Sequence, residues 1–165
     1  MDNYGVKGQA RTVFDTGLRV GGESLFSLSA CAGNELWAGN LNQAQALYRR
    51  IGESFQANAI SCYGQAHVAA LRGDGALALA LARDARQRWP VASHFREAEL
   101  HAWLGDHAAA LRTLQLAIAA MESPCVLAGV TCAFQALADD AGFLNLLGQL
   151  GLTRWYGTEC HLDQT

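Results

Sequence analysis

Lysine is almost missing from this sequence. Lys7 is the only one, the remaining positive charges are arginines, and the net charge is −3 at neutral pH. Such a chain lacks the extended basic surface that attracts nucleic acids and anionic membranes. The arginines at positions 83, 86 and 88 are interleaved with Asp84, which is typical of a solvated helix face. We therefore expect neither nucleic acid nor a membrane as a partner.

Long apolar runs and prolines are also scarce. No apolar run approaches the roughly 20 residues that span a bilayer, and the N-terminus has no signal-peptide core, so we expect a soluble, cytoplasmic protein. Proline occurs only at positions 90 and 124, while alanine and leucine dominate without β-branched runs. These features favour helix throughout, and 165 residues suffice for one domain with a continuous core.

The pairs of residues that hold metals or form nucleophiles are not found at the required spacing. His94 and His101 lie seven residues apart, and Cys62 and His67 lie five apart, whereas metal ligands on a helix recur at i and i+4 or form a CxxC pair. The sequence therefore predicts no catalytic residue, no metal and no cofactor. An odd number of widely spaced cysteines is typical of reduced thiols packed in a core; they are Cys31, Cys62, Cys125, Cys132 and Cys160.

A short corner recurs along the chain. Its best example is Leu104-Gly105-Asp106, between two runs rich in alanine and leucine, and related corners stand at Gly39 and Gly73. Glycine can adopt the positive φ that ends one helix, and aspartate can cap the next one. The spacings between the glycines, 34 and 32 residues, are typical of an array of helical hairpins.

The pattern predicts four helix pairs. The first three pairs are 24–38 with 42–53, 56–71 with 76–88, and 91–104 with 108–121. The fourth is 125–138 with 141–150, where Asp139-Asp140 suits a helix start. Residues 1–22 form an N-terminal helix or a partly ordered extension, residues 23–152 the repeat domain, and residues 153–165 a tail. Some glycines inside these helices, such as Gly33, Gly64 and Gly129, cost stability unless close packing requires them.

In this register the chain resembles the tetratricopeptide repeat (TPR) family. The matching positions in the second repeat are Ala66, Gly73, Ala78, Ala85 and Pro90, and the other two repeats match in register, although the Trp-Leu-Gly of the family's first helix is missing. The segment Phe143 to Leu152 is similar to the end of the C-terminal TPR arrays of bacterial regulators. The resemblance implies an all-α fold, a right-handed superhelix of three TPR-like hairpins with a C-terminal capping helix pair.

The family's inner surface is lined mainly by the first helix of each pair. Transferred to this chain, that geometry implies an aromatic groove for a peptide or a helix, with His67 and Glu99 as polar groups. For the two tryptophans an equally simple interpretation is that they fill the space between adjacent hairpins. The residues expected in the groove are Tyr63, His67, Phe95, Glu99, Trp103, Trp37 and Phe26.

The leading hypothesis is a non-enzymatic interaction module, a scaffold or adaptor that binds a peptide or helical segment of another protein. Three alternatives remain open. The first is a small dedicated chaperone, the second is a regulatory subunit of an enzyme or transcription factor, and the third is a small-molecule binder that uses His67 and Glu99. Self-association into a homo-oligomer is expected in any case, because the ends of repeat arrays expose apolar faces unless they are capped.

Overall fold

The structure, a computed structural model, describes residues 23–56, 58–89 and 93–152, together with Thr12, Val13, Thr16, Gly17 and Val20. These five N-terminal residues are helical. The predicted tail, with Trp155 and Tyr156, lies outside the described residues. Within the described ranges the chain forms helices, turns and short connections and contains no strand, so the all-α prediction is confirmed there.

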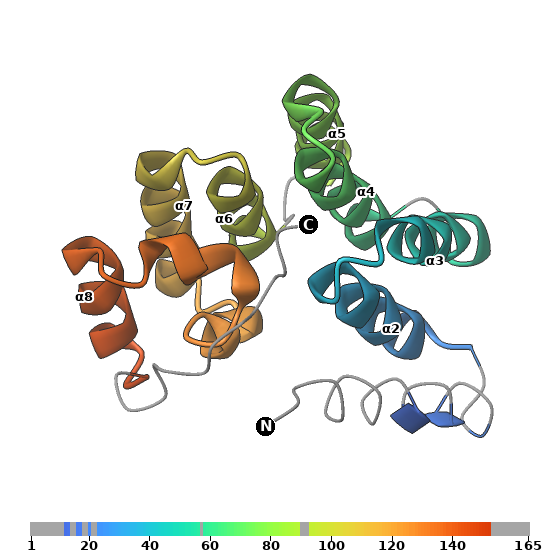
Figure 1. Cartoon of the computed structure of the whole chain (residues 1–165), viewed down its shortest axis with the longest axis horizontal. Coiled ribbons are helices and arrows are strands. Elements are labelled where there is room, and N and C mark those ends of the chain that lie inside the picture. Colours follow the sequence, from blue (N-terminus) through green and yellow to red (C-terminus); the bar gives the residue numbers. More distant parts are fainter. Residues whose placement is uncertain are drawn as a thin grey trace.

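Three helical hairpins make up most of the described chain, and each predicted helix of the first three pairs is present (Figure 1). The first hairpin is α2 (Leu25–Trp37) with α3 (Leu41–Ser54), the second α4 (Ala59–Leu71) with α5 (Gly75–Arg88), and the third α6 (His94–Trp103) with α7 (His107–Ala119).

Each hairpin turns at a glycine, as predicted. Gly39, Gly73 and Gly105 have φ values of +79°, +82° and +76°, a conformation that costs other residues about 1–2 kcal/mol. Asp74 and Asp106 then cap the next helix, because their side chains accept hydrogen bonds from Leu77 N and Ala109 N at 3.0 Å. In the second and third hairpins the repeated corner therefore forms the glycine turn and the aspartate cap that its sequence predicts.

The fourth pair is where the helix prediction is wrong. Instead of one helix over 125–138, the chain forms two 3-10 helices, η1 (Ser123–Leu127) and η2 (Cys132–Leu137), before α8 (Ala141–Gln149). Gly129 lies in the turn between them, and the Thr131 hydroxyl donates to the Leu127 carbonyl at 2.9 Å. Both features favour a break over a continuous helix. Asp140 caps α8, as predicted, by accepting from Gly142 N at 2.8 Å and Phe143 N at 3.0 Å.

The interior consists of three clusters of buried side chains. One lies within α2 and α3, a second within α4 and α5, and a third among α6, α7, η1, η2 and α8. Side chains also cross the hairpin boundaries. Val68 of α4 belongs to the first cluster and Leu100 of α6 to the second, and the partly buried Leu71, Trp103 and Leu104 pack against the cluster of the preceding hairpin.

Close helix packing explains one of the helical glycines. A Cβ atom on Gly64 would lie 2.1 Å from Cδ1 of Tyr48, so only glycine lets α4 approach α3 at this point. Gly33 is different, because a Cβ atom there would meet nothing within 4 Å. Gly129, expected inside a helix, stands in a turn.

The packing predicted for the cysteines is found at the four that the structure describes. Cys31, Cys125 and Cys132 are buried, and Cys62 is half-buried. Cys160 lies outside the described residues. Among the described helices, none is both long and apolar enough to cross a membrane.

Candidate functional site

The two aromatic residues expected at the centre of the groove lie inside the protein. Tyr63 and Phe95 are each 1% exposed. Tyr63 belongs to the core of the second hairpin, and Phe95 belongs to the core of the third, where its ring meets that of Phe134 edge-on at 5.7 Å. A partner does not reach either ring in this conformation. Neighbouring elements cover both rings.

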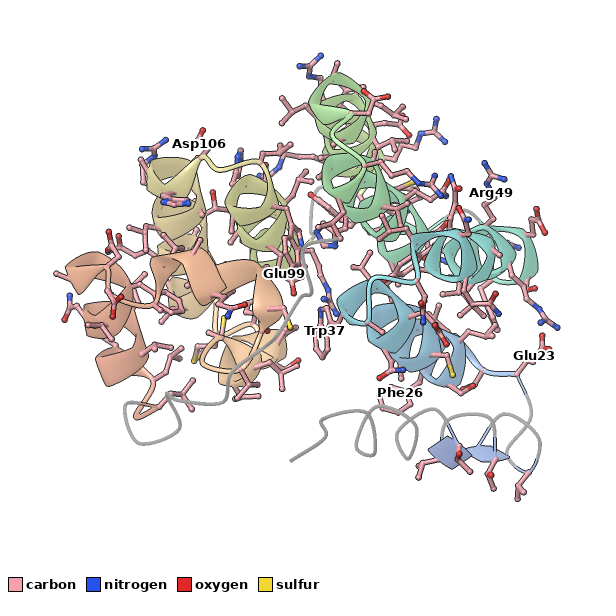
Figure 2. The ribbon with its side chains drawn as sticks, viewed as in Figure 1. Glu23, Phe26, Trp37, Arg49, Glu99 and Asp106 are labelled. Carbon is pink, nitrogen blue, oxygen red and sulfur yellow. The ribbon has the colours of Figure 1, made fainter. Side chains whose placement is uncertain are left out.

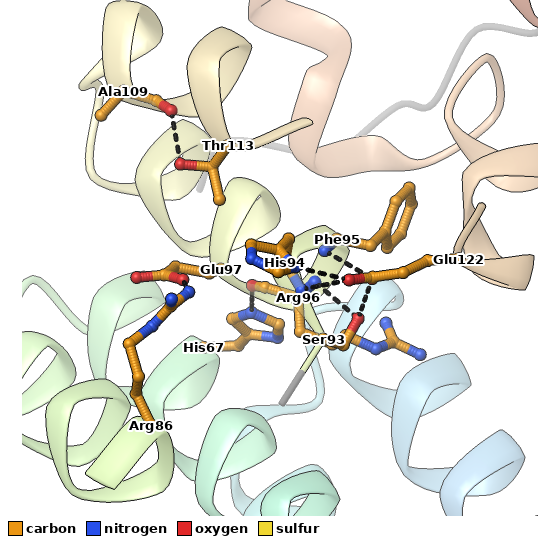
Figure 3. A network of polar contacts seen from close by, with 10 residues as sticks. All are labelled: His67, Arg86, Ser93, His94, Phe95, Arg96, Glu97, Ala109, Thr113 and Glu122. Atoms are coloured by element: carbon orange, nitrogen blue, oxygen red, sulfur yellow. Dashed lines mark hydrogen bonds and ion pairs between the residues drawn. The ribbon is translucent and has the colours of Figure 1, made fainter. Parts of the chain in front are cut away.

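The two polar groups expected in the groove are buried as well. His67 and Glu99 are each 2% exposed. Nε2 of His67 lies 2.8 Å from the carbonyl oxygen of Arg96, so Nε2 carries a proton and donates it across the contact between α4 and α6 (Figure 3). Burial lowers the pKa of His67 more than the nearby Glu99 carboxylate raises it. His67 is therefore neutral and serves as a link between two hairpins.

Glu99 is held by a neighbour on its own helix. The guanidinium of Arg96 donates from Nη1 to Oε2 of Glu99 at 2.8 Å, and the Arg96 side chain remains 40% exposed. The pair also acts electrostatically on Tyr48 of α3. Burial raises the pKa of Tyr48 to about 12, with Arg96 lowering it and Glu99 raising it by smaller amounts. Tyr48, His67, Arg96 and Glu99 thus form one polar cluster that connects α3, α4 and α6. No local sequence pattern predicts this cluster.

The tryptophans are half-buried and differ in their surroundings. Trp103, at the end of α6, packs against both the second and the third core clusters, which supports the interpretation that it fills the space between hairpins. Trp37, at the end of α2, packs against the edge of the first cluster. In Figure 2, Trp37 and Glu99 point into the space between α2 and α6.

Phe26 is the most exposed residue of the predicted set, at 85%. It begins a stripe on α2 that continues through Ala30 and Gly33 to Trp37, opposite the face that buries Leu28, Ala32 and Leu36. The single charged residue of α2, Glu35, is buried and accepts a hydrogen bond from Asn40 at 2.7 Å. The stripe itself therefore carries no polar or charged side chain. Within it Phe26 is exposed, while Ala30, Gly33 and Trp37 are half-buried.

Glu122 forms a second polar site that sequence reasoning missed. Its carboxylate follows α7 and reaches the start of α6, where it accepts from Ser93 Oγ at 2.7 Å, His94 N at 2.8 Å and Phe95 N at 3.0 Å (Figure 3). Nδ1 of His94 lies 2.8 Å from the same carboxylate. Burial alone would raise the pKa of Glu122, but the hydrogen bonds from Phe95, Ser93 and His94 lower it overall. The Glu122 site thus connects the segment after α7 to the start of α6.

One pocket lies at the turn of the first hairpin, with a volume of about 620 Å³. Polar groups dominate its wall, and Arg72 is fixed there by hydrogen bonds to Asn42 Oδ1 at 2.6 Å and Gln45 Oε1 at 2.8 Å. It does not include His67 or Glu99, the residues expected to bind a small molecule. Its lining residues are Glu35, Gly39, Asn40, Leu41, Asn42, Gln43 and Arg72.

No group of three or more His, Cys, Asp or Glu side chains in the described part of the chain is arranged to hold a metal ion. Cys160 and His161 lie outside those residues. Searches against protein-family models, curated proteins and solved structures found no match for this chain.

Proposed function

We propose that this protein is a non-enzymatic interaction module of the TPR type, a right-handed superhelix of helical hairpins that binds a peptide or helical segment of another protein. The observation that carries the proposal is the apolar stripe on α2. Phe26 is 85% exposed, and Gly33 leaves open space above the helix between Phe26 and Trp37. Exposed apolar stripes without charge mark surfaces that a partner covers.

The proposed binding surface is this stripe, not the full groove. Tyr63, His67, Phe95 and Glu99 are internal residues that hold the hairpins, while Phe26, Ala30, Gly33 and Trp37 form the α2 stripe that meets the partner. An apolar side chain of the partner would occupy the open space at Gly33, between the two aromatic rings. A preformed helix face limits the ordering cost of binding.

The decisive experiment introduces charge on the α2 stripe without disturbing the core. The partner is first captured from native lysate, identified by mass spectrometry, and its binding segment measured against the purified chain by fluorescence anisotropy. We expect Gly33→Glu and Phe26→Glu each to weaken binding at least tenfold while circular dichroism stays unchanged. Leu116→Glu is the matched control, because Leu116 is an exposed leucine on α7, 55% accessible, away from the stripe.

The possible outcomes separate the alternatives. Equal loss of binding in Leu116→Glu and the α2 variants, or no loss in any of them, would contradict the stripe as the binding surface. If light scattering shows an oligomer that Phe26→Glu dissociates, the stripe binds a second copy of the chain. A chaperone should copurify with an unfolded client, and a regulatory subunit with a folded enzyme or transcription factor.

The pocket at the first turn favours a second candidate function, small-molecule binding. Its wall combines the buried carboxylate of Glu35 with the guanidinium of Arg72 and several amides, groups that suit a small polar molecule. A thermal shift screen with polar metabolites tests it. A stabilising compound should lose its effect in Arg72→Ala and keep it in Gly33→Glu.

A further inference from the structure

The described chain consists of two units that meet at the contact between α4 and α6: the first two hairpins, and the third hairpin with η1, η2 and α8. The core of α6, α7, η1, η2 and α8 is separate from the cores of the first two hairpins, and Leu100 is the buried α6 residue that enters the second hairpin's core. Within the described part of the chain, α6 packs closely on α4 but hardly meets α5. In Figure 1, α5 accordingly stands apart from α6 and α7.

Few side chains complete this contact. His67 of α4 donates to the carbonyl oxygen of Arg96 at 2.8 Å, and Leu100 enters the core of the second hairpin. Trp103 packs against the clusters on both sides, and Leu104 packs against the second one. An ion pair between Arg86 of α5 and Glu97 of α6 lies at the edge of the contact (Figure 3). A contact this narrow can open while the helices of each unit keep their own cores.

We propose that the α4–α6 contact is a joint that opens on acidification, with His67 as the group that takes up the proton. Nε2 already carries the hydrogen donated to Arg96, so the second proton must enter at Nδ1, inside the contact. The resulting imidazolium is buried in the closed joint and hydrated in the open one. Burying an ion costs far more than burying a neutral ring, so protonation favours opening.

The charged groups around His67 are consistent with opening of the joint at low pH. Arg96 and Glu99 face it from α6 and are already paired with each other, and Tyr48 lies within their electrostatic reach from α3. Glu35 of α2 is hydrogen-bonded to Asn40. Of the α5 charges, Arg86 and Asp84 act on Tyr63 and Cys62. Burial outweighs the attraction of Glu99 and lowers the pKa of His67 below its ordinary value.

The sign and size of the effect follow from linkage. A histidine with a lowered pKa in the closed state stabilises that state above its ordinary pKa of about 6.5, and the stabilisation is lost as pH falls below that value. Between pH 8 and pH 5 the ratio of open to closed joint therefore rises by at most about 30-fold. The test uses Leu100→Ala, which removes the buried α6 side chain from the second hairpin's core and so shifts the equilibrium toward the open state.

The test measures opening and helicity together. A reporter chain with Trp37→Phe, Trp89→Phe and Trp155→Phe leaves Trp103, at the joint, as the single tryptophan, which is excited selectively at 295 nm or above. In the Leu100→Ala reporter we expect, from pH 8 to pH 5, a red shift of Trp103 emission and a larger radius of gyration by X-ray scattering, with far-UV circular dichroism unchanged. Adding His67→Gln, which keeps a donor but cannot be charged, should abolish the pH dependence.

Matched controls make the outcome decisive. His107→Gln, on the exposed start of α7, should leave the pH dependence intact. The proposal is overturned if no shift occurs, if it survives His67→Gln, or if helicity is lost together with the shift. If the reporter substitutions prevent folding, 5-fluorotryptophan is incorporated into the Leu100→Ala chain, and the environment of Trp103 is followed by fluorine NMR. The Trp103 signal is assigned as the one that Trp103→Phe removes. The same outcomes support or overturn the proposal.

Discussion

The carboxylate of Glu122 accepts a hydrogen bond from the backbone N–H of Phe95 at 3.0 Å, so the residue that follows α7 caps the start of α6. The two ends of the third hairpin are thereby fastened by one side chain. Helix N-termini carry unpaired N–H groups and a positive partial charge, and a carboxylate satisfies both. Ser93 and His94 add their hydrogen bonds to the same group.

Replacing Glu122 should therefore destabilise the chain. We expect Glu122→Ala to lower the free energy of unfolding by about 2–3 kcal/mol, because several donors near a partly buried carboxylate lose their acceptor. Urea denaturation followed by circular dichroism measures the loss. Glu53→Ala, an exposed glutamate near the end of α3, is the matched control and should change stability by less than about 0.5 kcal/mol. Equal effects of the two substitutions would contradict the capping role.

Because Glu122 stabilises the fold as a carboxylate, the free energy of unfolding should depend on pH in the acid range. The pKa of Glu122 is lowered in the folded state, so its stabilising contribution is present above the ordinary glutamate pKa and disappears as pH falls through the lowered value. The stability difference between wild type and Glu122→Gln should shrink as pH falls below about 4.5. Urea midpoints at a series of pH values give this difference. A difference that stays constant down to pH 2.5 would show that the charge of Glu122 is unimportant.

Two helical glycines should respond in opposite directions to alanine. A Cβ atom on Gly64 would lie 2.1 Å from the Tyr48 ring, so Gly64→Ala should cost about 1–3 kcal/mol through overpacking. A Cβ atom on Gly33 meets nothing within 4 Å, so Gly33→Ala should stabilise α2 by about 0.5–1 kcal/mol. Thermal unfolding of the two variants tests both signs, and a stable Gly64→Ala protein would contradict the close approach of α3 and α4.

Asn40 differs from its counterparts Asp74 and Asp106 in what it contacts. It makes no side-chain cap for α3 and instead donates to the buried carboxylate of Glu35 at 2.7 Å. Asn40→Asp removes the donor and brings two carboxylates together, so it should cost about 1–3 kcal/mol. Asp106→Asn keeps a good capping residue and should be nearly neutral. Chemical denaturation compares them, and equal losses would show that the Glu35 contact contributes nothing.

The hairpins were predictable because their determinants are local. Gly105 and Asp106 are adjacent in the sequence, and the turn and cap that they form require nothing from the rest of the chain. The break in the predicted helix at 125–138 also has local causes, but glycine inside an alanine- and leucine-rich run is tolerated often enough that Gly129 alone did not indicate it.

Burial of the expected groove residues was not predictable in the same way. Helical spacing places Tyr63 and Phe95 on a stripe, but it does not say which distant element covers that stripe. Tyr63 became internal in the cluster that includes Leu100 of α6, and Phe95 in the cluster that includes Phe134 of η2. Glu122 was missed for a similar reason, since its partner Phe95 is 27 residues away in the sequence. Phe26 and Trp37 kept some exposure because, among the described elements, α3 and α4 are the ones that pack against α2, and they cover its other face.

The placement of Leu100 in the core of the preceding hairpin affects how the chain folds during synthesis. The ribosome releases α4 and α5 before α6, so the second hairpin waits with an incomplete interior until Leu100 emerges. The first hairpin likewise receives Val68 from α4, so each of these two nascent hairpins completes its interior with a side chain of the next one. A chain stalled at the end of α5 would therefore expose the apolar surface that Leu100 later covers.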